Sequence, residues 1–93
     1  MHIQTNIEPS GAVTLTVGGT FNAAGVADFE RALDEARRLA QPVFLDLARI
    51  RLIDRPTLKY LIDLLHRDVR LVICPPHVEQ WIARESQTDQ AIE

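Results

Sequence analysis

The stretch from Val43 to His66, VFLDLARIRLIDRPTLKYLIDLLH, constrains the possible folds of this chain most strongly. It begins with a short apolar run, Val43–Leu47, which follows a proline and is typical of a buried strand. Apolar residues then recur at i, i+3, i+4 and i+7, which predicts an amphipathic helix from Leu58 to His66. Free N–H groups and the positive end of the helix dipole converge where a strand leads into a helix, so α/β proteins often bind anions and partners there.

The sequence Asp54-Arg55-Pro56-Thr57 predicts how this helix begins. Pro56 suits the first helical position, because its missing N–H would have no intrahelical partner there and its φ angle is already helical. The residue before a proline is pushed out of the α region, so we expect Arg55 as the N-cap and Asp54 just outside the helix. An exposed cation at a helix N-terminus opposes the dipole by roughly 0.3–1 kcal/mol. Arg55 therefore either points into water or pairs with Asp54, or it presents a guanidinium fork to an anionic group on a partner.

Alternating polarity precedes this strand and helix. Apolar and polar residues alternate in His2–Ile7 and again in Ala12–Val17, and Pro9-Ser10-Gly11 between them is a turn cluster. Two half-buried strands joined by so short a turn predict an antiparallel hairpin, which we expect to end at Gly18-Gly19.

A further helix and strand complete the predicted sheet. Asn22 is a good N-cap for a helix from about Ala23 to Ala40, and the apolar run Arg70–Cys74 predicts the last strand. Strand–helix–strand passages imply parallel, right-handed crossovers. We therefore expect an α/β fold with a small mixed sheet, in which an N-terminal antiparallel hairpin is followed by parallel strands and the crossover helices lie mainly on one face.

A chain of 93 residues is long enough for one hydrophobic core but not for two. We expect a single domain over residues 1–85, closed by a helix from His77 to about Glu85. The polar tail, residues 86–93, is expected to fray.

Composition and charge argue against several classes of function. The formal net charge is −3, and nine of the ten basic residues are arginines that form no basic block, so nucleic acid is not an expected partner. No signal-like N-terminus and no run of membrane-spanning length is visible, so we expect a cytoplasmic protein without direct membrane insertion. The single cysteine, Cys74, excludes an internal disulfide and fits a reducing compartment.

Two local motifs and the order of elements resemble the STAS domain, the module of sulfate transporters and anti-sigma-factor antagonists. The motifs are GTFN at Gly19–Asn22, which resembles the turn before the first helix of that family, and DLARIRLIDRPTL at Asp46–Leu58. In the second motif the strand, the loop length, Asp54 and Leu58 fall in register with the family's pattern. The resemblance spans about Ile3 to Arg84 and implies the STAS fold and its interaction surface.

The chain departs from this family at the position that carries its switch. In phosphorylation-controlled members the residue after the second aspartate is Ser or Thr, whereas here it is Arg55, which cannot accept a phosphoryl group. The family's glycine two residues on is Thr57, and its acidic residue before the first helix is Asn22. Thr57 is the only hydroxyl in the loop, and we expect it to fill the first helical turn rather than to accept a phosphate. We therefore expect no phosphorylation control.

Two classes of function remain open. The first is a non-catalytic module that docks a protein partner through the loop and helix start. The resemblance implies that the partner is an anti-sigma factor with a kinase-like ATP-binding fold. It equally implies a transporter assembly as the partner, since small STAS proteins also serve as accessory subunits of lipid-transport ATPases. A second copy of the chain, forming a homodimer, is a further option. The second class is a binder of a nucleotide or another small anionic ligand at the same helix N-terminus. The expected partner-binding residues are Asn22, Asp54, Arg55, Pro56, Thr57, Leu58 and Tyr60.

The remaining polar residues predict no metal, cofactor or catalytic site. His2, His66 and His77 fall on different predicted elements and have no metal-ligand spacing. Asp54 is explained by its place beside the helix start and Asp63 by an exposed helix face, which leaves no pair of carboxylates for acid–base catalysis. We therefore do not expect an enzyme.

Overall fold

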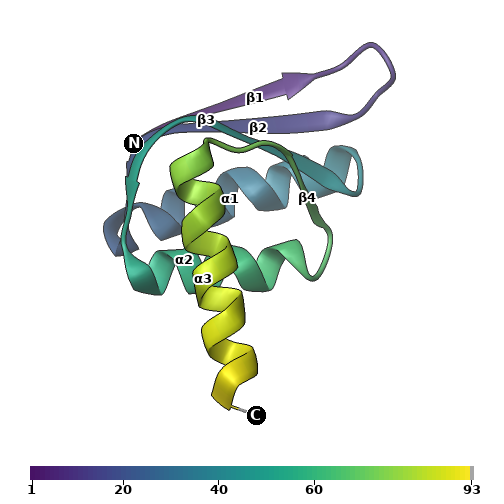
Figure 1. Cartoon of the computed structure of the whole chain (residues 1–93). Coiled ribbons are helices and arrows are strands. Elements are labelled where there is room, and N and C mark those ends of the chain that lie inside the picture. Colours follow the sequence, from purple (N-terminus) through teal and green to yellow (C-terminus); the bar gives the residue numbers. More distant parts are fainter. Residues whose placement is uncertain (93) are drawn as a thin grey trace.

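The computed structural model describes the backbone of residues 1–92 and the side chains of residues 1–85. The four strands form one mixed sheet in the order β1-β2-β3-β4, in which β1 and β2 are antiparallel and the other two pairs are parallel (Figure 1). The fold class expected from the sequence is thereby confirmed. Along the chain the elements are β1 His2–Ile7, β2 Val13–Phe21, α1 Ala23–Leu39, β3 Val43–Ile53, α2 Arg55–Leu65, β4 Val69–Ile73 and α3 Pro76–Ile92.

The helices lie on one side of the sheet and leave its other side uncovered (Figure 1). Alternation along β2 explains this arrangement, because Val13, Leu15 and Val17 are fully buried while the intervening threonines are only partly buried. On the helical side, Phe29 of α1 and Leu61 of α2 are also fully buried. The core therefore lies between one face of the sheet and the helices.

Strand β3 is longer than the sequence predicted, since it stays paired with β2 up to Ile53, and two bulges interrupt this pairing. Thr16 pairs with Asp46, Gly18 with Arg49 and Thr20 with Leu52, so β3 contains one extra residue in each interval. The buried residues of β3 are therefore two positions apart at 43, 45 and 47, and three positions apart from there to 50 and 53. Our expectation that β3 ends at Leu47 was therefore wrong. The pairing of the hairpin ends at Gly18, as expected, but β2 itself continues to Phe21 along β3.

Helix α2 begins one residue earlier than predicted. Asp54 is its N-cap, with an extended backbone, and the Asp54 Oδ1 atom accepts a hydrogen bond of 3.0 Å from the Thr57 N–H. Arg55 is the first helical residue rather than the N-cap, and Pro56 follows within the first turn. The short side chain of Asp54 can reach a free N–H of the first turn, and this capping bond outweighs the preference of a pre-proline residue for extended geometry.

The last helix also departs from the prediction. Strand β4 ends at Ile73, one residue before the expected end, and α3 continues to Ile92, although we expected it to end near Glu85. Val78 of α3 is fully buried, which anchors the start of this helix in the core. The expected tail, residues 86–93, is thus helical up to residue 92. The side chains of this segment and the whole of Glu93 lie outside the described part, so the expected fraying stays a prediction. Within residues 1–92, no helix is both long and apolar enough to cross a membrane.

Candidate functional site

The N-termini of α1 and α2 lie next to each other where β2 and β3 end. Asn22 caps α1, since its Oδ1 atom accepts a hydrogen bond of 3.1 Å from the Ala24 N–H. The Asp54 N–H, in turn, donates to the Phe21 carbonyl oxygen at 3.3 Å and ties the start of α2 to the residue before this cap. In open α/β sheets, ligands and partners bind outside the carboxyl ends of the strands. The structure therefore brings Asn22 and Asp54 together at the expected kind of position.

The cap of α2 is anionic. The hydroxyl of Thr57, followed by the N–H of the same residue, lowers the pKa of the Asp54 carboxyl from its ordinary value of 3.8. Near neutral pH this group is thus a carboxylate at the positive end of the helix dipole. The N-terminus of α2 already has an anion of its own.

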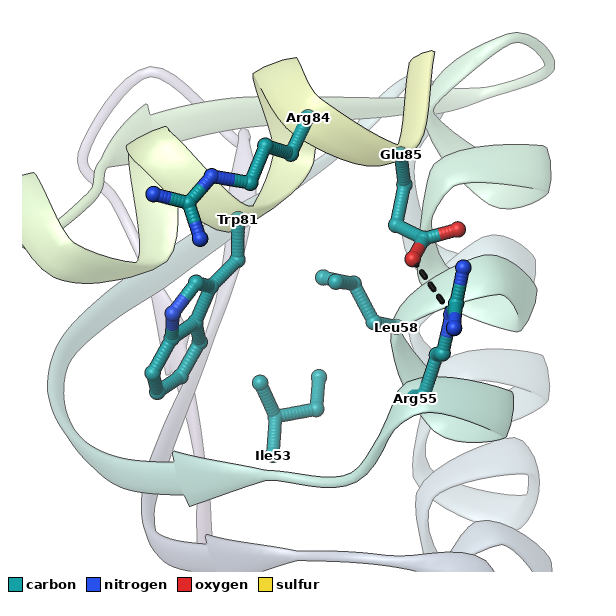
Figure 2. Close-up of a pocket in the computed structure, with 6 residues that line it drawn as sticks. All are labelled: Ile53, Arg55, Leu58, Trp81, Arg84 and Glu85. Carbon is teal, nitrogen blue, oxygen red and sulfur yellow. Dashed lines mark hydrogen bonds and ion pairs between the residues drawn. The ribbon is translucent and has the colours of Figure 1, made fainter. Parts of the chain in front are cut away.

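Arg55 forms an ion pair with a residue of α3. Its Nε atom donates to Oε1 of Glu85 at 2.6 Å, and both side chains are drawn in Figure 2. The Arg55 side chain remains 66% exposed, whereas that of Glu85 is only 10% exposed. Oε2 of Glu85 is buried and has no hydrogen-bond partner within the described part of the chain. Arg55 therefore neither extends freely into water nor pairs with Asp54, but is held against the last helix.

A recess lies between the end of β3, the start of α2 and helix α3. Its volume is about 390 Å³. Figure 2 shows an apolar part formed by Ile53, Leu58 and Trp81, with the Arg55–Glu85 pair at one side. Arg84 completes the lining from α3. An apolar recess with an arginine beside it can hold an apolar side chain and a neighbouring acidic group at the same time.

Two of the predicted partner-binding residues are buried. Thr57 is 2% exposed and Leu58 is 4% exposed. Leu58 lines the recess between α2 and α3, while the Thr57 hydroxyl is shielded from solvent. By contrast, Arg55 and Pro56 are exposed, and Asn22 and Asp54 are partly exposed. The accessible part of the predicted surface thus comprises these last four residues and the exposed part of Tyr60.

Tyr60 is half-buried between the first two helices. Its ring packs edge-on against Phe29, with ring centroids 6.2 Å apart. Burial, with a smaller contribution from the Glu30 carboxylate, raises the pKa of Tyr60 to about 12. Tyr60 therefore belongs to the contact between α1 and α2, and only part of it can serve as a contact for a partner.

The residues of α3 in the recess were not recognised from the sequence. Trp81 and Glu85 are spaced i, i+4 and so lie on the same face of the helix, which is the only local sign that they act together. Nothing in the sequence relates Glu85 to Arg55, because the two residues are 30 positions apart. The two residues come into contact only because α3 packs across α2, as Figure 1 shows.

Other reactive side chains lie apart from one another. Within the described residues, no three His, Cys, Asp or Glu side chains form a group that could hold a metal ion. His77 packs edge-on against Trp81, with ring centroids 5.1 Å apart. Burial, and to a smaller extent Glu79, raises the pKa of the Cys74 thiol, which lowers the thiolate fraction.

Comparisons of this chain with protein-family models, with curated proteins and with solved structures find no match. The resemblance to STAS domains therefore stays a prediction, supported by residues 19–22 and 46–58 and by the order of elements.

Proposed function

We propose that this chain is a non-catalytic protein-interaction module, similar to an anti-sigma-factor antagonist, that docks a protein partner through the start of α2. The observation that carries this proposal is the placement of Arg55, whose side chain is fixed by Glu85 but remains 66% exposed. Asn22, Asp54 and Pro56 lie at the same edge of the sheet and complete the proposed contact surface.

The guanidinium group of Arg55 is fixed before a partner arrives. Its Nε atom is used by Glu85, whereas the two terminal nitrogens make no hydrogen bond to the described side chains. These nitrogens form the end of the fork, which matches the two oxygens of a carboxylate. Since Glu85 already restricts the side chain, binding a partner loses less conformational entropy than it would for a free arginine.

The recess beside Arg55 favours a protein as the occupant. Ile53, Leu58 and Trp81 offer an apolar surface, which an apolar side chain of a partner can fill while a neighbouring Asp or Glu pairs with Arg55. An acidic segment with an apolar anchor fits this surface. An anti-sigma factor or a transporter subunit remains the partner suggested by the family resemblance.

A small anion at the same helix N-terminus is less well supported. Asp54 already accepts the Thr57 N–H and carries a negative charge at this point. A nucleotide phosphate placed there would meet this carboxylate and would have to displace its hydrogen bond. The geometry thus favours a protein partner over an anionic ligand.

Affinity capture from the source cell tests this proposal. The wild type, Arg55→Lys and Arg55→Ser would be immobilised, and the captured proteins identified by mass spectrometry. Arg55→Lys keeps the charge but loses the fork, so it should reduce the capture of a specific partner, and Arg55→Ser should abolish it.

Arg38→Gln is the matched control, because Arg38 is an exposed arginine in the last turn of α1, away from the start of α2. This variant should capture the partner as the wild type does. Equal capture by all four proteins, or capture of no specific protein by the wild type, would argue against the proposed function.

A further inference from the structure

A second recess lies on the side of the sheet that no helix covers. Its volume is about 360 Å³, and it lies at the end of the sheet where β1 begins and β2 and β3 approach their ends. Met1 and a glycine pair in β2 complete its lining, whose polar side chains come from three strands. These side chains are His2, Gln4, Thr16, Arg49 and Arg51.

The bulges of β3 place the two arginines on this side. In a regular strand, Arg49 and Arg51 would continue the alternation set by Leu47 and would point into the core. The extra residue before Arg49 reverses the alternation, and the second bulge allows Ile50 and Ile53 to face the core on either side of Arg51. The Asp46 Oδ1 atom accepts a hydrogen bond of 2.9 Å from the Ala48 N–H and so stabilises the first bulge.

Neither arginine is neutralised by a carboxylate among the described side chains. Arg31, Arg37 and Arg67 each form an ion pair within the described part of the chain, but Arg49 and Arg51 form none there. Two like charges in one recess repel each other, so the arrangement does not serve folding. An anion that binds between them would remove this repulsion.

Gly18 forms the part of the recess where β2 and β3 approach each other closely. A Cβ atom at this position would lie 3.0 Å from the Cβ atom of Arg49, which is closer than such atoms normally approach. The missing side chain of Gly18 thus lets Arg49 of β3 approach β2 closely at this point, and Gly18 itself is buried.

Two neutral donors supplement the arginines. The Thr16 hydroxyl oxygen accepts a hydrogen bond from the Asn6 side chain, so its own hydrogen remains able to donate. The Gln4 amide donates one hydrogen bond to Asn6 and has a second N–H for another acceptor. Both side chains line the recess.

We propose that this recess binds the phosphate monoester group of a small soluble ligand, with Arg49 and Arg51 as the two charged contacts. Guanidinium forks match phosphate oxygens, and Gln4 and Thr16 add neutral donors to the remaining oxygens. A volume of about 360 Å³ suits a small ligand rather than a polymer. This site is on the opposite side of the sheet from the helices, and it does not depend on the proposed docking function.

Calorimetric titration with inorganic pyrophosphate, a compact probe with terminal phosphate oxygens, tests the site. The wild type should bind one pyrophosphate with saturation, and Arg49→Gln and Arg51→Gln should each weaken the affinity about tenfold. Arg70→Gln is the matched control, because Arg70 is an exposed arginine that pairs in register with Phe44 on the same side of the sheet but does not line the recess. Its affinity should equal that of the wild type.

Three results would overturn the proposal. The first is the absence of saturable binding by the folded wild type, and the second is an equal loss of affinity in Arg70→Gln, which would indicate unspecific attraction. The third is binding to phosphatidylcholine vesicles that contain phosphatidate without any binding of pyrophosphate, which would indicate a lipid surface instead of a small soluble ligand. Because all three substituted arginines are exposed, circular dichroism should show an unchanged fold in each variant.

Discussion

The Nε atom of Arg55 lies 2.6 Å from the Oε1 atom of Glu85, which joins the first residue of α2 to the last helix of the chain. The two partners differ in their surroundings, since the arginine is mostly exposed and the carboxylate is nearly buried. A nearly buried carboxylate requires a compensating charge more than an exposed arginine does. The pair therefore stabilises the packing of α3 in addition to fixing the proposed docking residue.

Removing Arg55 should destabilise the fold as well as the proposed contact. Arg55→Ser leaves the Glu85 carboxylate without its partner, and because the arginine is largely exposed we expect a loss of only about 1 kcal/mol in the free energy of unfolding. For a chain of this length, thermal denaturation should show a melting temperature lower by roughly 4–8 °C.

A double-mutant cycle with Glu85→Gln separates this pair from other effects. If the two residues stabilise each other, the double variant should lose less stability than the sum of the two single variants. Additive losses would contradict the stabilising role of the ion pair. Arg38→Gln, with an exposed arginine that forms no ion pair in the described residues, should leave the melting temperature almost unchanged.

The cap of α2 should make stability depend on acid. The pKa of Asp54 is lower in the folded chain than its ordinary value of 3.8, so its contribution is complete above this pH and is lost as the pH falls through the folded pKa. Asp54→Asn can still cap the helix but does not titrate. Melting curves between neutral pH and pH 2 should therefore show a smaller acid-induced loss in Asp54→Asn than in the wild type. An equal acid-induced fall in melting temperature in the two proteins would refute the stabilising role of the Asp54 carboxylate as the cap.

Tyr60 offers a spectroscopic test of the packing between α1 and α2. It is the only tyrosine of the chain, so ultraviolet absorbance reports its ionisation alone. In the folded protein it should ionise near pH 12, whereas in the urea-unfolded chain it should ionise near its ordinary pKa of 10.0. Because the neutral phenol is favoured by burial, its contribution to stability is present below pH 10 and is lost as the pH rises toward 12. A folded-state midpoint near 10 would place the ring in solvent.

Local patterns in the sequence were sufficient for most of the elements. Alternation in β1 and β2 predicted the hairpin, and the 3.6-residue periodicity predicted α1 and α2 to within a few residues. The bulges of β3 were not predictable in this way. Its buried residues after Leu47 recur every three positions, at Ile50 and Ile53, which matches neither a regular strand nor a regular helix.

Only the part of the candidate site that is contiguous in the sequence was predictable. The loop Asp54–Leu58 was identified correctly as a helix start, but the choice of Arg55 over Asp54 as the N-cap gave too much weight to the restriction before Pro56. The partner of Arg55 could not be found, because Glu85 approaches it through tertiary packing alone. Periodicity likewise does not tell how deeply the first turn of a helix is buried, which is why Thr57 was counted among the contact residues.

The burial of Thr57 predicts that the folded chain does not accept a phosphate in this loop. Its side chain is 2% exposed and lies within the first turn of α2, so a protein kinase cannot reach the hydroxyl without unfolding that turn. Incubation of the folded chain with a serine/threonine kinase and ATP should add no phosphate at Thr57, as measured by peptide mass spectrometry. A synthetic peptide of residues 50–62, which exposes the same hydroxyl, is the positive control for the kinase. Modification of the folded chain at Thr57, absent in Thr57→Val, would show that the loop opens and that a phosphorylation switch operates at this threonine.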